Sequence, residues 1–123
     1  MARADTQAIG SDAESRALAW LLEQGLRLVA RNYRCRVGEI DLVMTDRQCL
    51  VFIEVRYRKP GSKITAVESV GPAKQRKLVR AAARFIGHNR RFHHSTVRFD
   101  VVAIDGPSTG SSDWHWIRDA FRP

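Results

Sequence analysis

The sequence predicts an α/β domain built on a mixed sheet. Three observations support this prediction: a periodic helical segment opens the chain, three extended segments follow it, and a second helical segment separates them from a fourth extended segment. A helical crossover returns the chain to the sheet in the same direction, so the last strand is expected to run parallel to a neighbour. The predicted order is therefore helix, three strands, helix, strand.

The first helix is predicted over residues 11–24. Ser11 and Asp12 resemble an N-cap, and Gly25 ends the helix. Its packed side is expected to consist of Ala17, Leu18, Trp20, Leu21 and Leu22. Glu14 falls on the same stripe as two of these leucines, so its carboxylate is expected to lean toward the interior. An exposed acid that favours the helix dipole is the simpler alternative.

Three extended segments follow, at residues 26–33, 39–44 and 50–57. Gly38 separates the first two, and the polar residues 45–48 separate the second from the third. Short separations of this kind join antiparallel neighbours, because a parallel connection needs a dozen or more residues. The segments therefore predict an antiparallel meander.

The second helix is predicted to begin at Gly71-Pro72 and to run to about Ile86, since proline is favoured at a first helical position. Its apolar positions are Leu78, Val79, Ala82, Phe85 and Ile86. The other face of this helix carries basic residues. A fourth strand is predicted at 97–104, and a short terminal strand at 114–117.

Length and composition limit the class of protein. The chain has 123 residues, 44% hydrophobic and 28% charged, which excludes wholesale disorder and fibrous architectures. The four-residue apolar run at 50–53 is far shorter than the roughly 20 residues of a membrane-spanning helix, and residues 1–10 lack the apolar region of a signal peptide. We expect one cytoplasmic domain, 1–123, with its core at about 10–105 and a C-terminal extension at 106–123.

Positive charge is concentrated in one segment. The net charge is +8, from 21 Lys and Arg against 13 Asp and Glu. Between Glu68 and Asp100 the chain has no acidic residue, but it has Lys74, Arg76, Lys77, Arg80, Arg84, Arg90, Arg91 and Arg98. Such a region is typical of a polyanion binder, with nucleic acid as the leading partner, although a solvated helix face explains it about equally well. A membrane surface is disfavoured, because no broad apolar face opposes the charges.

Two carboxylates, Asp41 and Glu54, occupy strand positions where a core pattern would have apolar residues. If Thr45 pairs with Leu50, Asp41 lies opposite Glu54 and the two Cβ atoms are about 5 Å apart. Carboxylates placed in this way repel unless a cation or a shared proton holds them, and an all-oxygen ligand set favours Mg²⁺ or Mn²⁺ over zinc. Salt bridges to arginines such as Arg56 are the competing explanation, and a register shift of one residue would put the acids on opposite faces.

Several separated motifs in this order resemble one known family. They are Glu14 in the first helix, the segments 38–43 and 52–58, the helix with Lys74, and the segment 98–102. Together they resemble the bacterial YraN-like family, which is classed with the endonucleases and is similar to archaeal Holliday-junction resolvases of the PD-(D/E)XK superfamily. The resemblance covers about residues 10–105. It implies a restriction-endonuclease-like core and hydrolysis of phosphodiester bonds in nucleic acid, DNA first, including branched structures.

The resemblance also implies a site. Glu14, Asp41 and Glu54 would bind Mg²⁺ or Mn²⁺, with the Val55 carbonyl as a further ligand. Arg56 stands where the family pattern has a lysine, and an arginine, with its pKa above about 12, cannot act as a general base. Arg56 is therefore expected to stabilise charge on the phosphate and to position water. This departure keeps open a nucleic-acid-binding accessory protein with the same fold and weak or no turnover.

The second helix gains a role in this interpretation. Lys74 is expected to point toward the site, whereas Arg76, Lys77, Arg80 and Arg84 would bind backbone phosphates without sequence preference. A homodimer is expected by analogy, because resolvases need two active sites on paired strands. Asp100 is expected to form an ion pair with a basic neighbour.

Overall fold

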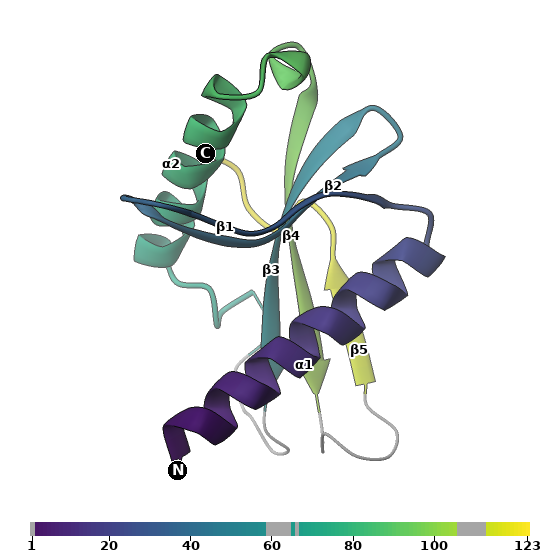
Figure 1. Cartoon of the computed structure of the whole chain (residues 1–123), viewed down its shortest axis with the longest axis vertical. Helices are drawn as coiled ribbons and strands as arrows, with labels where there is room; N and C mark the ends of the chain where they lie inside the picture. The colour runs from purple at the N-terminus through teal and green to yellow at the C-terminus, as the bar shows by residue number, and fades with distance from the viewer. Residues whose placement is uncertain (1, 59–64, 66, 106–112) are drawn as a thin grey trace.

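Five strands form one sheet that has a helix on each face (Figure 1). The computed structural model describes residues 2–58, 65, 67–105 and 113–123. Neighbours in the sheet follow the order of the sequence, with the strands β1 (Arg27–Cys35), β2 (Gly38–Asp46), β3 (Cys49–Arg58), β4 (Thr96–Asp105) and β5 (Asp113–Ile117). The helices are α1 (Ala2–Glu23), α2 (Pro72–Gly87) and the short 3₁₀ helix η1 (Arg90–Phe92).

The pairing of the strands confirms the meander and the mixed sheet. β1, β2 and β3 are antiparallel neighbours, β3 and β4 run parallel, and β5 returns antiparallel to β4. The turn between β2 and β3 is shorter than predicted, because the strands extend to Asp46 and Cys49. Arg47 in this turn has a φ of 59°, as tight hairpins require. The assumed register is confirmed from Asp46–Cys49 to Leu42–Ile53, including the pair of Thr45 with Leu50. The pairing stops there, so Asp41 and Glu54 do not form the strand pair that was predicted.

Helix α1 begins earlier than predicted. It starts at Ala2 rather than at residue 11, so Ser11 and Asp12 lie inside the helix and the predicted N-cap is wrong. A cap residue needs a non-helical backbone, whereas the residues that precede this pair continue the helix. Leu21 is fully buried against the sheet, but Leu22 is 47% exposed, so the packed side is narrower than expected.

The sheet separates two hydrophobic clusters. The cluster on the α2 side includes Ile40, Val43, Phe52, Leu78, Phe85 and Phe99. The cluster on the α1 side includes Ala17, Leu21, Leu42, Val51, Ile53 and Val102. Ile40 and Val43 lie on the α2 side, whereas Leu42 between them lies on the α1 side. The regular alternation of side chains along β2 therefore breaks beside Asp41.

The C-terminal segment packs closely on the sheet and is not an appendage of the core. Besides the β4–β5 pairing, the Trp114 ring stacks on Trp20 of α1 with 5.2 Å between centroids, and Phe121 stacks on Phe99 at 5.1 Å. The part of the expected extension at residues 106–112 lies outside the described residues. Within the described ranges, no helix is both long enough and apolar enough to cross a membrane.

Asp100 fastens this segment to β4. Its buried carboxylate accepts hydrogen bonds from Arg98 Nε at 2.9 Å and Nη2 at 3.0 Å, from Trp116 Nε1 at 2.9 Å, and from the Asp119 N–H at 2.9 Å. The predicted ion pair with a basic neighbour is thus confirmed, with Arg98 as the neighbour. The same arginine also contacts Asp46 at 3.1 Å.

Candidate active site

The candidate site lies where β2 and β3 separate. The pairing between these strands runs from Asp46 and Cys49 to Leu42 and Ile53. Asp41 is the next residue of β2 beyond the last pair. Beyond this pair, the Asp41 Oδ2 atom accepts a hydrogen bond of 2.8 Å from the Val55 N–H. The N–H and the carbonyl of a strand residue point to the same side of the strand, so the Val55 carbonyl faces the same space as the Asp41 carboxylate.

Glu54 provides a buried carboxylate next to this separation. Its side chain is 6% exposed, and its Oε1 atom lies 3.5 Å from Arg56 Nη2 and 3.8 Å from Lys74 Nζ. Burial raises the pKa of Glu54 to about 7, with repulsion from Asp41 as the next cause, while the Lys74 and Arg56 charges oppose the rise. Its Oε2 atom is buried and has no hydrogen-bond partner within the described part of the chain. A buried carboxylate oxygen of this kind is expected to have a water molecule or an ion as its partner.

The charge of Asp41 acts on both of the other predicted acidic residues. Burial is the first cause that raises the pKa of Asp41, and the hydrogen bond from Val55 opposes it. The pKa of Glu14 is raised by burial first and by the Asp41 charge second. Asp41 thus raises the pKa values of both glutamates, although the three residues come from α1, β2 and β3.

The Glu14 carboxylate nevertheless contacts two residues of β1, Arg31 and Asn32. Its Oε1 atom lies 3.6 Å from Arg31 Nε, and the Asn32 amide nitrogen, oriented toward this acceptor, lies 2.8 Å from the same oxygen. Asn32 has a φ of 54°, a conformation that asparagine adopts more readily than most residues. Sequence reasoning missed Arg31 and Asn32. The asparagine in a strand was the only available signal.

Glu39 precedes Asp41 by two residues on β2 and has no partner among the described residues of β3. It contacts Arg34 on β1 at 3.4 Å, because the β2–β3 pairing has already ended at this point. Its charge still contributes to the raised pKa values of Asp41 and Glu54. Glu39 is therefore an acidic neighbour of the site that was not among the predicted site residues.

The donor set fits a hard divalent cation in part. No group of three or more His, Cys, Asp or Glu side chains in the described ranges is arranged to hold a metal ion, so the three-carboxylate ligand set is not assembled here. Mg²⁺, however, usually keeps several waters and takes one or two carboxylates from the protein. Asp41, Glu54 with its partnerless oxygen, and the Val55 carbonyl satisfy that requirement. Glu14 would have to leave Arg31 to join them.

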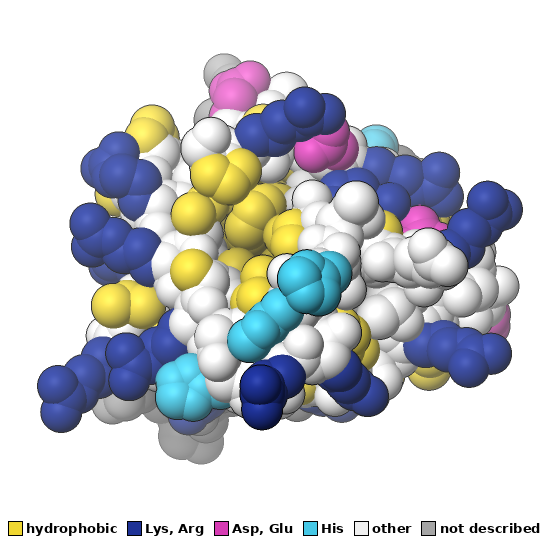
Figure 2. All heavy atoms as spheres, turned by 90° about the horizontal axis from the view of Figure 1, so that it is seen from above, with side chains coloured by type: hydrophobic (Ala, Val, Ile, Leu, Met, Phe, Trp, Pro, Cys, Tyr) yellow, Lys and Arg dark blue, Asp and Glu magenta, His cyan; other side chains and the backbone are white. Residues whose placement is uncertain are grey.

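Helix α2 brings basic side chains to the same side of the sheet. Lys74 in its first turn reaches Glu54, as predicted, while Leu78 and Phe85 anchor the helix in the core. The remaining predicted contacts are exposed on the outer face and are Arg76, Lys77, Arg80 and Arg84. Figure 2 looks from above onto the end of the molecule where α2 ends and η1 lies, and there Lys and Arg side chains outnumber acidic ones.

These features define an α/β protein with a mixed five-stranded sheet and an acidic pair, Glu54 buried and Asp41 partly buried, at a strand separation. The chain belongs to UPF0102, described as an uncharacterised protein family, whose model matches residues 13–104. A UPF0102 protein of Nitrosococcus oceani is 48% identical over 92% of this chain and 90% of its own length. Another from Pseudomonas fluorescens is 46% identical over 98% of both chains. The resemblance to the YraN-like family is thereby confirmed at the level of family membership.

Proposed function

We propose that this protein is a metal-dependent endonuclease of the PD-(D/E)XK superfamily that hydrolyses phosphodiester bonds in nucleic acid, most readily DNA. The observation that carries the proposal is the carboxylate pair at the strand separation. Asp41 is fixed by a backbone N–H, and Glu54 is buried with one oxygen that has no partner among the described residues. Buried acids next to cations and with raised pKa values are typical of sites that perform chemistry.

Mg²⁺ or Mn²⁺ held by Asp41, Glu54 and the Val55 carbonyl would supply a water of lowered pKa and would neutralise charge on the phosphate. Arg56, beside Glu54, stabilises the negative charge that develops on the phosphate oxygens. Because its guanidinium does not release a proton, it cannot act as the base. Lys74 also contacts Glu54, and its ammonium is able to donate a proton to the leaving oxygen.

Binding of the substrate is assigned to the exposed face of α2. Arg76, Lys77, Arg80 and Arg84 would neutralise backbone phosphates, which gives affinity without sequence preference. A preference for branched DNA would follow the resemblance to resolvases. Cleavage of two paired strands would then require two copies of the chain.

A plasmid-nicking assay tests the proposal. Supercoiled plasmid is incubated with the wild type, Asp41→Ala or Glu54→Ala, in Mg²⁺, in Mn²⁺ or in EDTA. We expect metal-dependent nicking by the wild type and a loss of at least about 100-fold in both variants, since each removes a group that acts on the transition state. Glu23→Ala, at the exposed end of α1, is the matched control and should nick like the wild type.

The second candidate function is a nucleic-acid-binding accessory protein without turnover. Two observations favour it: Arg56 replaces the lysine of the nuclease pattern, and Glu14 is held by Arg31. This candidate predicts that DNA binding persists in EDTA and that no metal ion elicits nicking. Metal-dependent nicking that disappears in Asp41→Ala would exclude it.

A further inference from the structure

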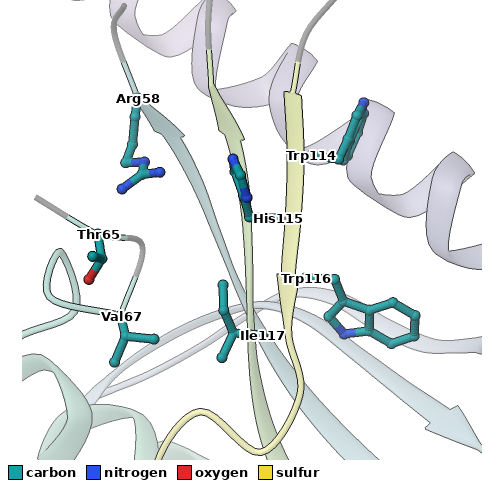
Figure 3. A pocket seen from close by; sticks show the side chains of 7 residues that line it. All are labelled: Arg58, Thr65, Val67, Trp114, His115, Trp116 and Ile117. Atoms are coloured by element: carbon teal, nitrogen blue, oxygen red, sulfur yellow. The ribbon is translucent and has the colours of Figure 1, made fainter. Parts of the chain in front are cut away.

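A pocket of about 540 Å³ opens next to the candidate active site (Figure 3). It is lined by Arg58 of β3, by Thr65 and Val67 before α2, and by Trp114, His115, Trp116 and Ile117 of β5. Figure 3 shows His115 and Ile117 on the side of β5 that faces Arg58 and Val67, while Trp114 and Trp116 project to the other side. A pocket of this volume accommodates a small organic ring system.

The strand registers connect this pocket to the acidic site. Across β4, Glu54 is in one row with Ile117, and Arg56 is in one row with His115. Each pair is separated by two strand spacings, about 10 Å. Ile117 belongs to the cluster on the α2 side, which is also the side from which Lys74 reaches Glu54. The pocket and the site therefore share one face of the sheet.

Two planar polar groups of the pocket, those of Arg58 and His115, are both paired with Asp105. Arg58 donates two hydrogen bonds of 2.6 Å to the two carboxylate oxygens of Asp105, and His115 Nε2 lies 3.0 Å from Asp105 Oδ2. One carboxylate thus fixes both planar groups and balances the Arg58 charge. A surface of this kind suits a flat, uncharged ring better than a phosphate, because guanidinium and imidazole planes stack on nucleobases.

We propose that this pocket binds one unpaired nucleobase of the nucleic-acid strand that is held at the Asp41–Glu54 site. The inference rests on the proposed function, since the base would belong to a nucleotide close to the phosphate that is cleaved. A base inside a duplex is stacked and paired, so it cannot enter a pocket unless it leaves the stack. The pocket therefore selects single-stranded or locally unpaired nucleic acid, and the side chains of Val67 and Ile117 form its apolar wall.

Binding in EDTA tests this inference without cleavage. Fluorescence polarisation is measured with a labelled single strand, with the matching full duplex, and with the same duplex carrying one bulged nucleotide. Two variants alter the pocket: His115→Ala removes a half-exposed planar group, and Val67→Trp fills the space. His94→Ala, an exposed histidine outside the pocket, is the matched control. Thermal unfolding of each variant shows that it is folded.

We expect the wild type to bind the single strand and the bulged duplex more tightly than the full duplex. His115→Ala and Val67→Trp should each weaken single-strand binding by about fivefold or more, as loss of one stacked base does, and leave duplex binding unchanged. Equal affinity of the wild type for single strand and duplex, or an unchanged preference in both folded variants, would overturn the inference. Nicking without such a preference would contradict this inference alone, whereas the preference without nicking would contradict only the proposed function.

Discussion

The Asp41 carboxylate accepts a hydrogen bond from the Val55 N–H across the end of the β2–β3 pairing. A side chain thus takes a position that a carbonyl of the neighbouring strand would hold in a continuous ladder. The backbone of the central strand β3 thus positions the Asp41 carboxylate, without a contribution from a Lys or Arg side chain. One oxygen of Asp41 is anchored in this way, and a ligand can approach the other.

The first prediction concerns pH and stability. The pKa of Glu54 rises from 4.5 to about 7 on folding, so the folded state binds this proton more tightly than the unfolded state does. The resulting stabilisation is complete below pH 4.5 and is lost as the pH rises through 7. In EDTA, the free energy of unfolding should therefore fall by roughly 3 kcal/mol between pH 4.5 and pH 8, as urea denaturation would show.

Glu54→Gln should remove most of this pH dependence, because the amide does not titrate, while Glu23→Gln should keep it. Mn²⁺ should reverse the trend in the wild type, since a metal ion binds the deprotonated carboxylate. A slope that is the same in Glu54→Gln and in the wild type would show that another group is responsible.

A second prediction separates the charge of Lys74 from its ability to transfer a proton. Lys74→Arg keeps a cation near Glu54 but replaces the ammonium with a guanidinium that does not release a proton, so nicking should fall by about 100-fold or more while DNA binding is maintained. Lys77→Arg, on the same helix and exposed, is the matched control and should keep full activity. Equal nicking by Lys74→Arg and the wild type would restrict Lys74 to an electrostatic role.

A third prediction concerns the outer face of α2. Arg80→Gln and Arg84→Gln should each weaken DNA binding equally for all sequences, and each should reduce the slope of log affinity against log salt by about 1. A salt titration of binding in EDTA measures both effects. Arg27→Gln, at the start of β1, removes the same charge away from α2 and should leave the slope unchanged. Equal slopes in all three variants would exclude a specific phosphate contact on α2.

A fourth prediction assigns Asp100 to stability. Asp100→Ala removes the acceptor of four hydrogen bonds and leaves Asp46 as the acidic partner of Arg98 among the described residues, so the free energy of unfolding should fall by about 3 kcal/mol. Urea denaturation measures the change, and Asp12→Ala in the exposed pair with Arg16 should alter it by less than about 0.5 kcal/mol. A loss that is small for both variants would show that the C-terminal segment is held by its aromatic contacts.

The sequence predicts those parts of the fold that depend on local patterns. Gly38, Pro72 and the alternation of apolar residues determine the meander, the start of α2 and the parallel strand that follows it. The pairing of Thr45 with Leu50 follows from the short turn between two strands of fixed register. For these reasons the positions of Asp41, Glu54 and Lys74 could be predicted.

Features that depend on tertiary contacts could not be predicted from the pattern. The end of the ladder at Leu42 reflects the break in side-chain alternation along β2, which becomes visible only when both clusters are assembled. The contact of Glu14 with Arg31, and the pairing of Arg58 with Asp105, join residues far apart in the chain. Neither contact leaves a periodic signal in the sequence.

The most direct test of the central claim is a calorimetric titration of the protein with Mn²⁺ at pH 8, where Glu54 is deprotonated. Asp41→Asn keeps an oxygen that can accept the Val55 hydrogen bond, and Glu54→Gln keeps the side-chain shape, so both variants should fold. The carboxylate pair predicts that the wild type binds one Mn²⁺ ion and that each variant binds it at least about tenfold more weakly, while Glu23→Gln binds it normally. Equal Mn²⁺ affinity in all four proteins, or no binding by the wild type, would contradict the account.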